Sequence, residues 1–206
     1  YIFCKNSNLH ERKLNLVSGV PVWLQAISKM LVNMVPMITC NAVFTACWIL
    51  LGHSGSTNGW FSLFIALGFA SSGVGCAISL AVSRQNLYLV SLIVCFIFAA
   101  FSGICPRLNS VGDAEWIWDL SFARWSSEAA FTLYTEHYAD EGLDVSRPAA
   151  EQMGYTLGRF EHDIGALWAL GFAGRIIGMI SLVRVAQPAA KRLEHEFVIK
   201  IRSMLG

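Results

Sequence analysis

Residues 30–52 read MLVNMVPMITCNAVFTACWILLG, and they point first to a membrane span. The stretch has no charged side chain and exceeds the roughly 20 apolar residues that a helix needs to cross a hydrocarbon core of about 30 Å. Three further apolar stretches lie at residues 60–82, 87–104 and 164–183. We therefore predict an all-α membrane protein with four transmembrane helices, the first of them kinked at Pro36.

The composition agrees with this class and excludes others. Of the 206 residues, 55% are hydrophobic and 14% are charged, against roughly 25% charged in an average soluble domain. A soluble enzyme and a disordered chain are therefore excluded. The Lys and Arg residues lie at the edges of the apolar stretches and form no basic stripe, so we expect no nucleic-acid partner.

The basic residues also predict an orientation, because cytoplasmic flanks are enriched in Lys and Arg. All the basic flanks of the apolar stretches fall on one side of an alternating four-span topology. They are Lys5, Arg12, Lys13, Lys29, Arg84, Arg184, Lys191, Arg192, Lys200 and Arg202. We therefore expect both ends of the chain to be cytoplasmic.

The segment 105–163 then lies outside, and it is acidic. Eleven of the 14 acidic residues fall between Asp113 and Asp163. Trp116, Trp118 and their aromatic neighbours predict short re-entrant helices at headgroup level. The rest, from Glu136 to Arg159, should be a solvated loop.

The chain divides into five regions. In order they are 1–28, 29–104, 105–163, 164–185 and 186–206. The first is a cytosolic interfacial region, the second holds three spans, the third is the outer region, the fourth is the last span, and the fifth is an amphipathic cytosolic tail. The chain starts at Tyr1 without Met, so we expect a piece of a longer protein.

The sequence contains no motif for catalysis or nucleotide binding. G-x-x-x-x-G-K-[ST], G-x-S-x-G, H-E-x-x-H and G-x-G-x-x-G are all absent. The four predicted spans contain no His, Asp or Glu, which disfavours a membrane-embedded enzyme. Glu161-His162-Asp163 could suggest metal ligands, but we interpret these residues as part of a solvated acidic loop and expect no metal site.

Arg175 is the one charge inside a predicted span, and such a charge is a functional hypothesis. The alternative is a structural role, in which its side chain snorkels or bonds to carbonyl groups of a neighbouring helix. Small residues on two spans predict close helix packing. They are Gly174 and Gly178 on the last span, and Ser71, Gly73 and Gly75 on the second.

Five short motifs carry a resemblance to a known family. They are Ser18-Gly19 followed by Lys29, Phe101-Ser102-Gly103, Phe122-Ala123-Arg124-Trp125 with Glu128-Ala129, Gly154-Tyr155, and Gly174-Arg175-Ile176-Ile177. Through them, residues 11 to 185 resemble the second half of the membrane domain of the G subfamily of ABC transporters, the white-type half-transporters with an ABC-2 fold. The last motif is similar to the final helix of the plant branch.

The resemblance implies a function and partners. The chain would hold family spans three to six and pair, as a homodimer or a heterodimer, with a second half-transporter. A nucleotide-binding domain upstream would hold ATP and Mg, so no cofactor is expected in this chain. A coupling helix would lie in residues 5–20, although Asn15 stands where the family usually has an acid.

The resemblance also assigns residues to the transport path. Leu92, Phe96 and Ala99 match positions that face the central cavity. Ile104 and Cys105 match the hydrophobic plug above it, where the family has paired leucines. From the pattern alone, the Phe-rich stretch 87–104 suits a cavity wall for a lipophilic ligand and a lipid-facing helix equally well.

These expectations make the chain the substrate pathway of an ATP-driven transporter for lipophilic small molecules or lipids. The alternative is a non-transporting four-span scaffold with tetraspanin-like topology. That class requires a Cys-Cys-Gly motif in its large outer loop, and residues 106–163 contain no Cys. The substrate, the direction of transport and the choice between plasma membrane and internal membrane stay open.

Overall fold

The computed structural model describes residues 22–51, 56–82, 85–104, 106–140 and 146–181, and in these ranges the ordered elements are helices. The long and medium helices are α3 (Val22–Leu50), α4 (Thr57–Ala81), α5 (Leu87–Ala100), α7 (Phe122–Asp140), α8 (Ser146–Met153) and a last helix, Phe160–Ser181. The short ones are η1 (Leu108–Ser110), η2 (Gly112–Ala114) and α6 (Glu115–Asp119).

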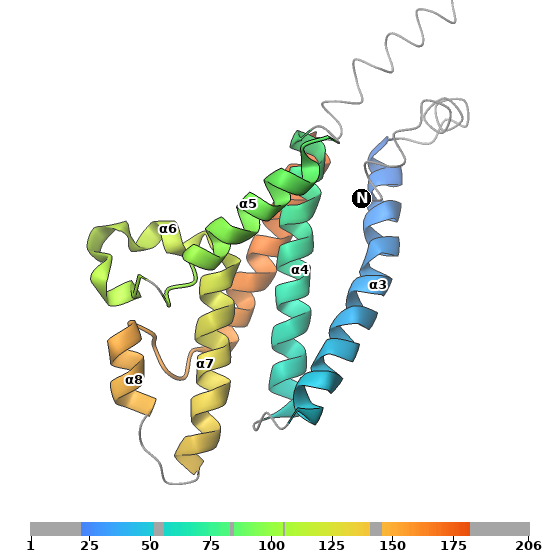
Figure 1. Ribbon diagram of the computed structural model, residues 1–206. Coiled ribbons are helices and arrows are strands. Elements are labelled where there is room, and N and C mark those ends of the chain that lie inside the picture. The colour runs from blue at the N-terminus through green and yellow to red at the C-terminus, as the bar shows by residue number, and fades with distance from the viewer. Residues whose placement is uncertain (1–21, 52–55, 83–84, 105, 141–145, 182–206) are drawn as a thin grey trace, which may run out of the picture.

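Three of these helices are long and apolar enough to cross a membrane. The segments that qualify are Met30–Leu50, Thr57–Ser79 and Phe160–Ser181. They correspond to three of the four predicted spans. The first is one continuous helix through Pro36, and it bends along its length in Figure 1, as expected where proline removes a backbone hydrogen bond.

The fourth predicted span, 87–104, is not confirmed. Helix α5 has 14 residues and ends at Ala100, so at 1.5 Å per residue it extends about 21 Å, short of a hydrocarbon core of about 30 Å. The chain turns at Gly103, whose φ of +82° is a left-handed conformation that favours glycine. The apolar stretch favours a longer helix, but the turn at Gly103 prevents α5 from continuing.

The core lies where α4, α7 and the last helix meet. Its central buried residues are Trp60, Leu63, Ala66, Ala70, Ala129, Leu133, Ile164 and Leu167. Helix α4 stands at the centre, with α3 on one side and α7 on the other (Figure 1). Edge-to-face and tilted rings of Phe44, Trp48, Trp60 and Phe64 join α3 to α4.

Glycines let α4 and the last helix approach closely, as the small-residue pattern predicts. A Cβ added to Gly73 would lie 2.6 Å from the Gly171 carbonyl oxygen, and one added to Gly174 would lie 2.7 Å from the Gly73 carbonyl carbon. Gly75 does not take part, since a Cβ there would meet no atom within 4 Å in the described part of the chain. The predicted contact is therefore right for Gly73 and wrong for Gly75.

The segment after α5 is more ordered than predicted. Helix α7 runs to Asp140 and packs on α4, so it is a long helix rather than a short interfacial one. The expected solvated loop from Glu136 to Arg159 also contains α8 and the buried residues Ala150 and Tyr155. The physical reason is that α7 and α8 place apolar faces against their neighbours, which an overall acidic composition conceals.

Two predicted regions fall mainly on residues that are not described. The coupling helix expected in 5–20 and the amphipathic tail expected in 186–206 both lie outside the described ranges. At the end of the expected interfacial region 1–28, residues from Val22 onward already belong to α3. The last helix similarly begins at Phe160, before the expected Ile164.

Candidate functional site

Helix α5 presents an exposed apolar face. Leu92, Phe96 and Ala99 are spaced four and three residues apart, which places them on one side of a helix. Leu92 is 56% exposed and Phe96 is 67% exposed, and Ala99 is exposed as well. No side chain of α5, which the structure describes in full, is buried. All three predicted pathway residues thus share one accessible face.

The position of α5 explains this exposure. The helix leaves the end of α4 and runs obliquely away from it toward α6 and α7 (Figure 1). Its far end is held by aromatic contacts, with ring centroids 4.5 Å apart for Phe98 and Phe122 and 4.8 Å apart for Phe101 and Trp118. The Ser121 hydroxyl also donates to the Phe98 carbonyl oxygen at 3.3 Å. The anchoring contacts therefore leave the Leu92 side free.

The predicted plug lies at the turn after α5. Ile104 is 54% exposed, and Cys105 lies outside the described residues. The Tyr155 hydroxyl donates to the Ser102 carbonyl oxygen at 3.1 Å. Burial, reinforced by the nearby Glu128 charge, raises the pKa of Tyr155 to about 12, so this phenol stays a neutral donor.

The motif residues that carry the family resemblance have physical roles here. Gly154 has a φ of +80°, and a Cβ at this position would lie 2.7 Å from the Asn109 backbone nitrogen. Only glycine fits this close approach without strain. Gly154 in turn places Tyr155 beneath the turn at Ser102, so two motifs far apart in the sequence form one contact.

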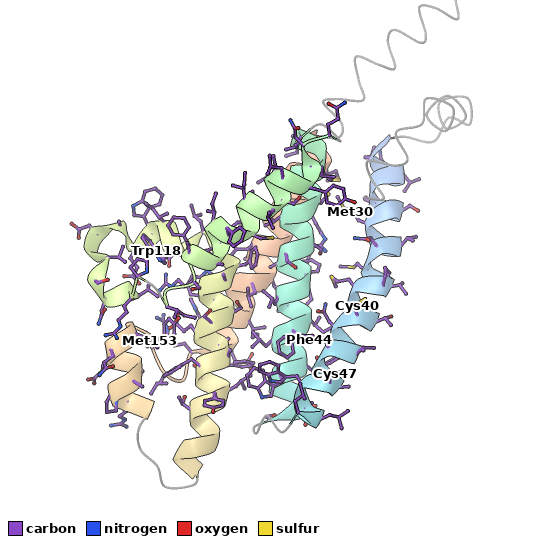
Figure 2. The ribbon with its side chains drawn as sticks, viewed as in Figure 1. Met30, Cys40, Phe44, Cys47, Trp118 and Met153 are labelled. Atoms are coloured by element: carbon purple, nitrogen blue, oxygen red, sulfur yellow. The ribbon has the colours of Figure 1, made fainter. Side chains whose placement is uncertain are left out.

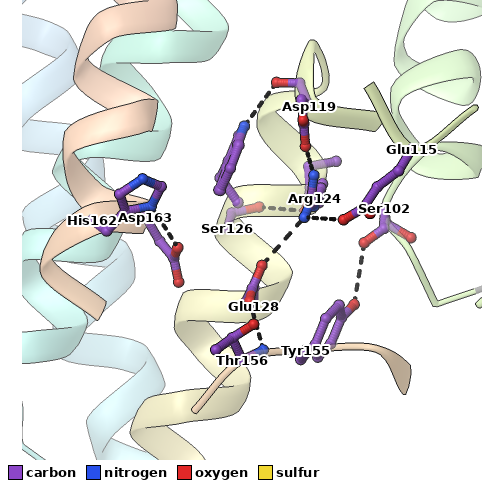
Figure 3. A network of polar contacts seen from close by, with 12 residues as sticks. Ser102, Glu115, Asp119, Arg124, Ser126, Glu128, Tyr155, Thr156, His162 and Asp163 are labelled. Carbon is purple, nitrogen blue, oxygen red and sulfur yellow. Dashed lines mark hydrogen bonds and ion pairs between the residues drawn. The ribbon is translucent and has the colours of Figure 1, made fainter. Parts of the chain in front are cut away.

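An ion-pair cluster around the buried Arg124 joins α6 to α7 (Figure 3). The Arg124 side chain is 9% exposed. It pairs with Glu115 at 2.9 Å, with Asp119, and more distantly with Glu128, whose Oε2 lies 3.9 Å from Nε. The Trp125 indole N–H donates to the Asp119 carbonyl oxygen at 2.8 Å. One guanidinium group therefore serves three carboxylates.

Asp163 was missed as a site residue. It is 1% exposed, whereas its neighbours Glu161 and His162 are exposed, so the interpretation as a solvated loop is wrong for Asp163. The signal in the sequence is helical spacing, because Asp163 precedes Leu167 by four residues on the buried side of the last helix. An acidic residue on that side must be buried.

Arg175 binds neutral groups of α4 and of its own helix. Its Nη1 donates to the carbonyl oxygens of Phe69 at 2.8 Å and Gly171 at 3.2 Å. Its Nη2 donates to the Ser72 hydroxyl at 2.6 Å, and the guanidinium carbon lies 3.6 Å from the Phe69 ring centroid. These contacts favour the structural alternative, in which an intramembrane charge clamps two helices.

The cysteines of the described helices differ in burial. Cys76 is buried, whereas Cys40, Cys47 and Cys95 are exposed at the surface of the described helices. Figure 2 shows Cys40 and Cys47 along α3.

Comparison with known proteins gives one partial similarity. Over 81 residues, which cover 38% of this chain, the sequence is 37% identical to the ABC-type transporter claG of Penicillium crustosum. The matching part spans 11% of that transporter's length. No protein-family model matches the chain, and no solved structure matches it. The chain is thus similar to an ABC-type transporter over the matched part, and its three long apolar helices fit a membrane protein.

Proposed function

We propose that the chain forms the substrate-pathway part of an ATP-driven ABC transporter that moves lipophilic small molecules or lipids. The observation that carries the proposal is the partial match to an ABC-type transporter. The accessible apolar face of α5 agrees with it. We assign the chain to the white-type G subfamily with an ABC-2 fold, close to the plant branch, on its five sequence motifs.

The pathway proposal rests on the chemistry of the α5 face. Leu92, Phe96 and Ala99 offer an aromatic and aliphatic surface without a charge. Binding to such a surface is favourable when it removes apolar ligand area from water, and the surface has no group that would orient a strongly charged ligand. The proposed substrates are therefore lipophilic and weakly charged, and Ile104 with Cys105 would close the path.

The proposal needs partners that supply energy and a second wall. A nucleotide-binding domain holding ATP and Mg would drive the change between inward and outward openings. A second half-transporter, identical or different, would cover the exposed faces of the helices. Both partners follow from the family assignment and are proposed together with it.

The first test is a bulky substitution on the α5 face in the full-length protein. Ala99→Trp should fill the path and lower ATP-dependent transport of a lipophilic dye in proteoliposomes by at least about tenfold, the effect of roughly 1.4 kcal/mol. Phe96→Ala should change the order of preference among dyes, because it removes an aromatic contact.

Ile97→Trp is the matched control for the bulky change. Ile97 is 47% exposed on the same helix, but at about 100° per residue it lies well away from the Phe96 and Ala99 side. Equal loss of transport in Ile97→Trp and Ala99→Trp would argue against a path along this face. A full-length protein without vanadate-sensitive ATPase activity would favour the four-span scaffold instead.

A further inference from the structure

The carboxylate of Asp163 is buried without a hydrogen-bond donor. Asp163 is 1% exposed, and neither of its carboxylate oxygens has a hydrogen-bond partner among the described residues. The His162 ring pairs with this carboxylate only when it is protonated. Its Nδ1 lies 3.6 Å from Oδ1, beyond hydrogen-bond distance, and the His162 side chain is 55% exposed. Such a group is strongly destabilising unless something compensates its charge.

A second buried carboxylate lies on α7. The Glu128 side chain is 4% exposed. Its Oε1 accepts a hydrogen bond from the Thr156 backbone N–H at 2.8 Å, but its Oε2 has no hydrogen-bond partner in the described part of the chain. Figure 3 shows the Asp163 carboxylate on the side of the last helix that faces α7, at the height of Glu128. Their sequence neighbours Ala129 and Ile164 belong to one buried cluster, so the two carboxylates lie on helices that pack together.

The charges around these two residues do not balance. Arg124 is already shared by Glu115, Asp119 and Glu128. The basic groups that act on Asp163 are His162 and Arg159, and both are exposed side chains. Asp163 comes from a different helix and adds a fourth carboxylate. Three buried oxygens, both from Asp163 and one from Glu128, thus lack a donor in the described residues.

We propose that Asp163 and Glu128 bind a small hard cation between the last helix and α7. Carboxylate oxygens are the preferred ligands of such ions, and one ion would satisfy all three oxygens at once. The described residues bring together no group of three His, Cys, Asp or Glu side chains that could hold a metal. The remaining ligands would be backbone, hydroxyl or water oxygens, which suits sodium or calcium rather than a transition metal.

The bound ion would tie the outer end of the last helix to α7. This role is independent of the transport proposal, because it concerns stability of the folded chain and needs no substrate. The test uses the full-length protein in detergent, in chlorides of sodium, potassium, calcium and choline at constant ionic strength and pH. We expect sodium or calcium to raise the Tm by several degrees above the value in choline, with a rise that follows the logarithm of ion concentration.

Asp163→Asn identifies the site. The amide keeps the shape of the side chain and removes the unpaired charge, so the variant should lose the ion dependence and melt in choline at or above the Tm of the native protein. If the Asp163 carboxylate stabilised the fold without binding an ion, Asp163→Asn would instead have a lower Tm than the native protein in every salt. Glu161→Gln is the control, because it removes one negative charge from an exposed side chain of the same helix. This variant should keep the native ion dependence.

Three results would overturn the proposal. They are a native Tm that is equal in all four chlorides, an ion dependence that survives Asp163→Asn, and a Tm that follows pH but ignores the metal ion, which would assign a proton to the site. If Asp163→Asn does not fold, calorimetric titration of the native protein with the stabilising chloride decides. Saturable heat that disappears in Glu128→Gln supports the site, and absent heat rejects it.

Discussion

Arg175 illustrates how a charge is accommodated inside an apolar helix. Its three hydrogen bonds go to the Phe69 and Gly171 carbonyls and to the Ser72 hydroxyl. The Ser72 hydroxyl also lies 3.5 Å from the Met37 sulfur of α3. A chain of polar contacts therefore links α3, α4 and the last helix, where polar contacts between helices stabilise association in lipid.

Arg175→Lys should weaken this link although it keeps the charge. An ammonium group lacks the planar fork that reaches two acceptors and the Phe69 ring together, so we expect a loss of about 2 kcal/mol of stability. Thermal unfolding of the full-length protein in detergent measures it. The exposed Arg159 provides the control, since Arg159→Lys should leave the Tm unchanged; equal shifts in both variants would contradict the clamp.

At the scale of elements, the contact between α4 and the last helix depends on glycines, which have no side chain to keep the two backbones apart. Gly73 lies against the backbone of Gly171 and Gly174, whereas Gly75 lies in open space within the described structure. The spacing of small residues predicts that the helices meet, but it does not say which glycine of the stripe faces inward. That choice depends on the rotation of each helix, which packing of the other helices sets.

Gly73→Ala and Gly75→Ala form a matched pair of variants. The Gly73 substitution forces the two backbones apart and should destabilise the protein by about 1–3 kcal/mol. The Gly75 substitution adds a methyl group without a clash and should be neutral or slightly stabilising, because alanine favours a helix. Urea or thermal unfolding compares them, and a larger loss from Gly75→Ala would reject this packing.

At the scale of the whole molecule, the segment between α4 and the last helix folds back along the side of α4 that lies opposite α3 (Figure 1). Helix α5 runs obliquely from the end of α4, and α7 lies beside α4 (Figure 1). The short helices η1, η2 and α6 connect α5 to α7. The acidic composition of 105–163 remains compatible with an outer location, which rests on the distribution of Lys and Arg.

The predicted topology can be tested by thiol labelling in intact cells. We expect Gln152→Cys to react with a membrane-impermeant maleimide from outside, and Lys191→Cys to react only after permeabilisation, because 105–163 is predicted outside and the tail inside. Labelling is measured as the increase over the background of the native cysteines. Reaction of both variants in intact cells would contradict a cytoplasmic C-terminal tail.

From the sequence alone one could infer a membrane protein and locate three helices long and apolar enough to cross a membrane, because about 20 successive apolar residues suit a hydrocarbon core. The sequence also located the small-residue contact, the charge at Arg175 and the motifs that resemble a transporter family. Helical spacing already puts Asp163 on the buried side of its helix with Leu167, but the end of α5 at Ala100 and the packing of Asp163 toward α7 appear only in the folded chain. Both depend on contacts between residues far apart in the chain, Tyr155 with Ser102 and α7 with the last helix, and local pattern carries no information about such contacts.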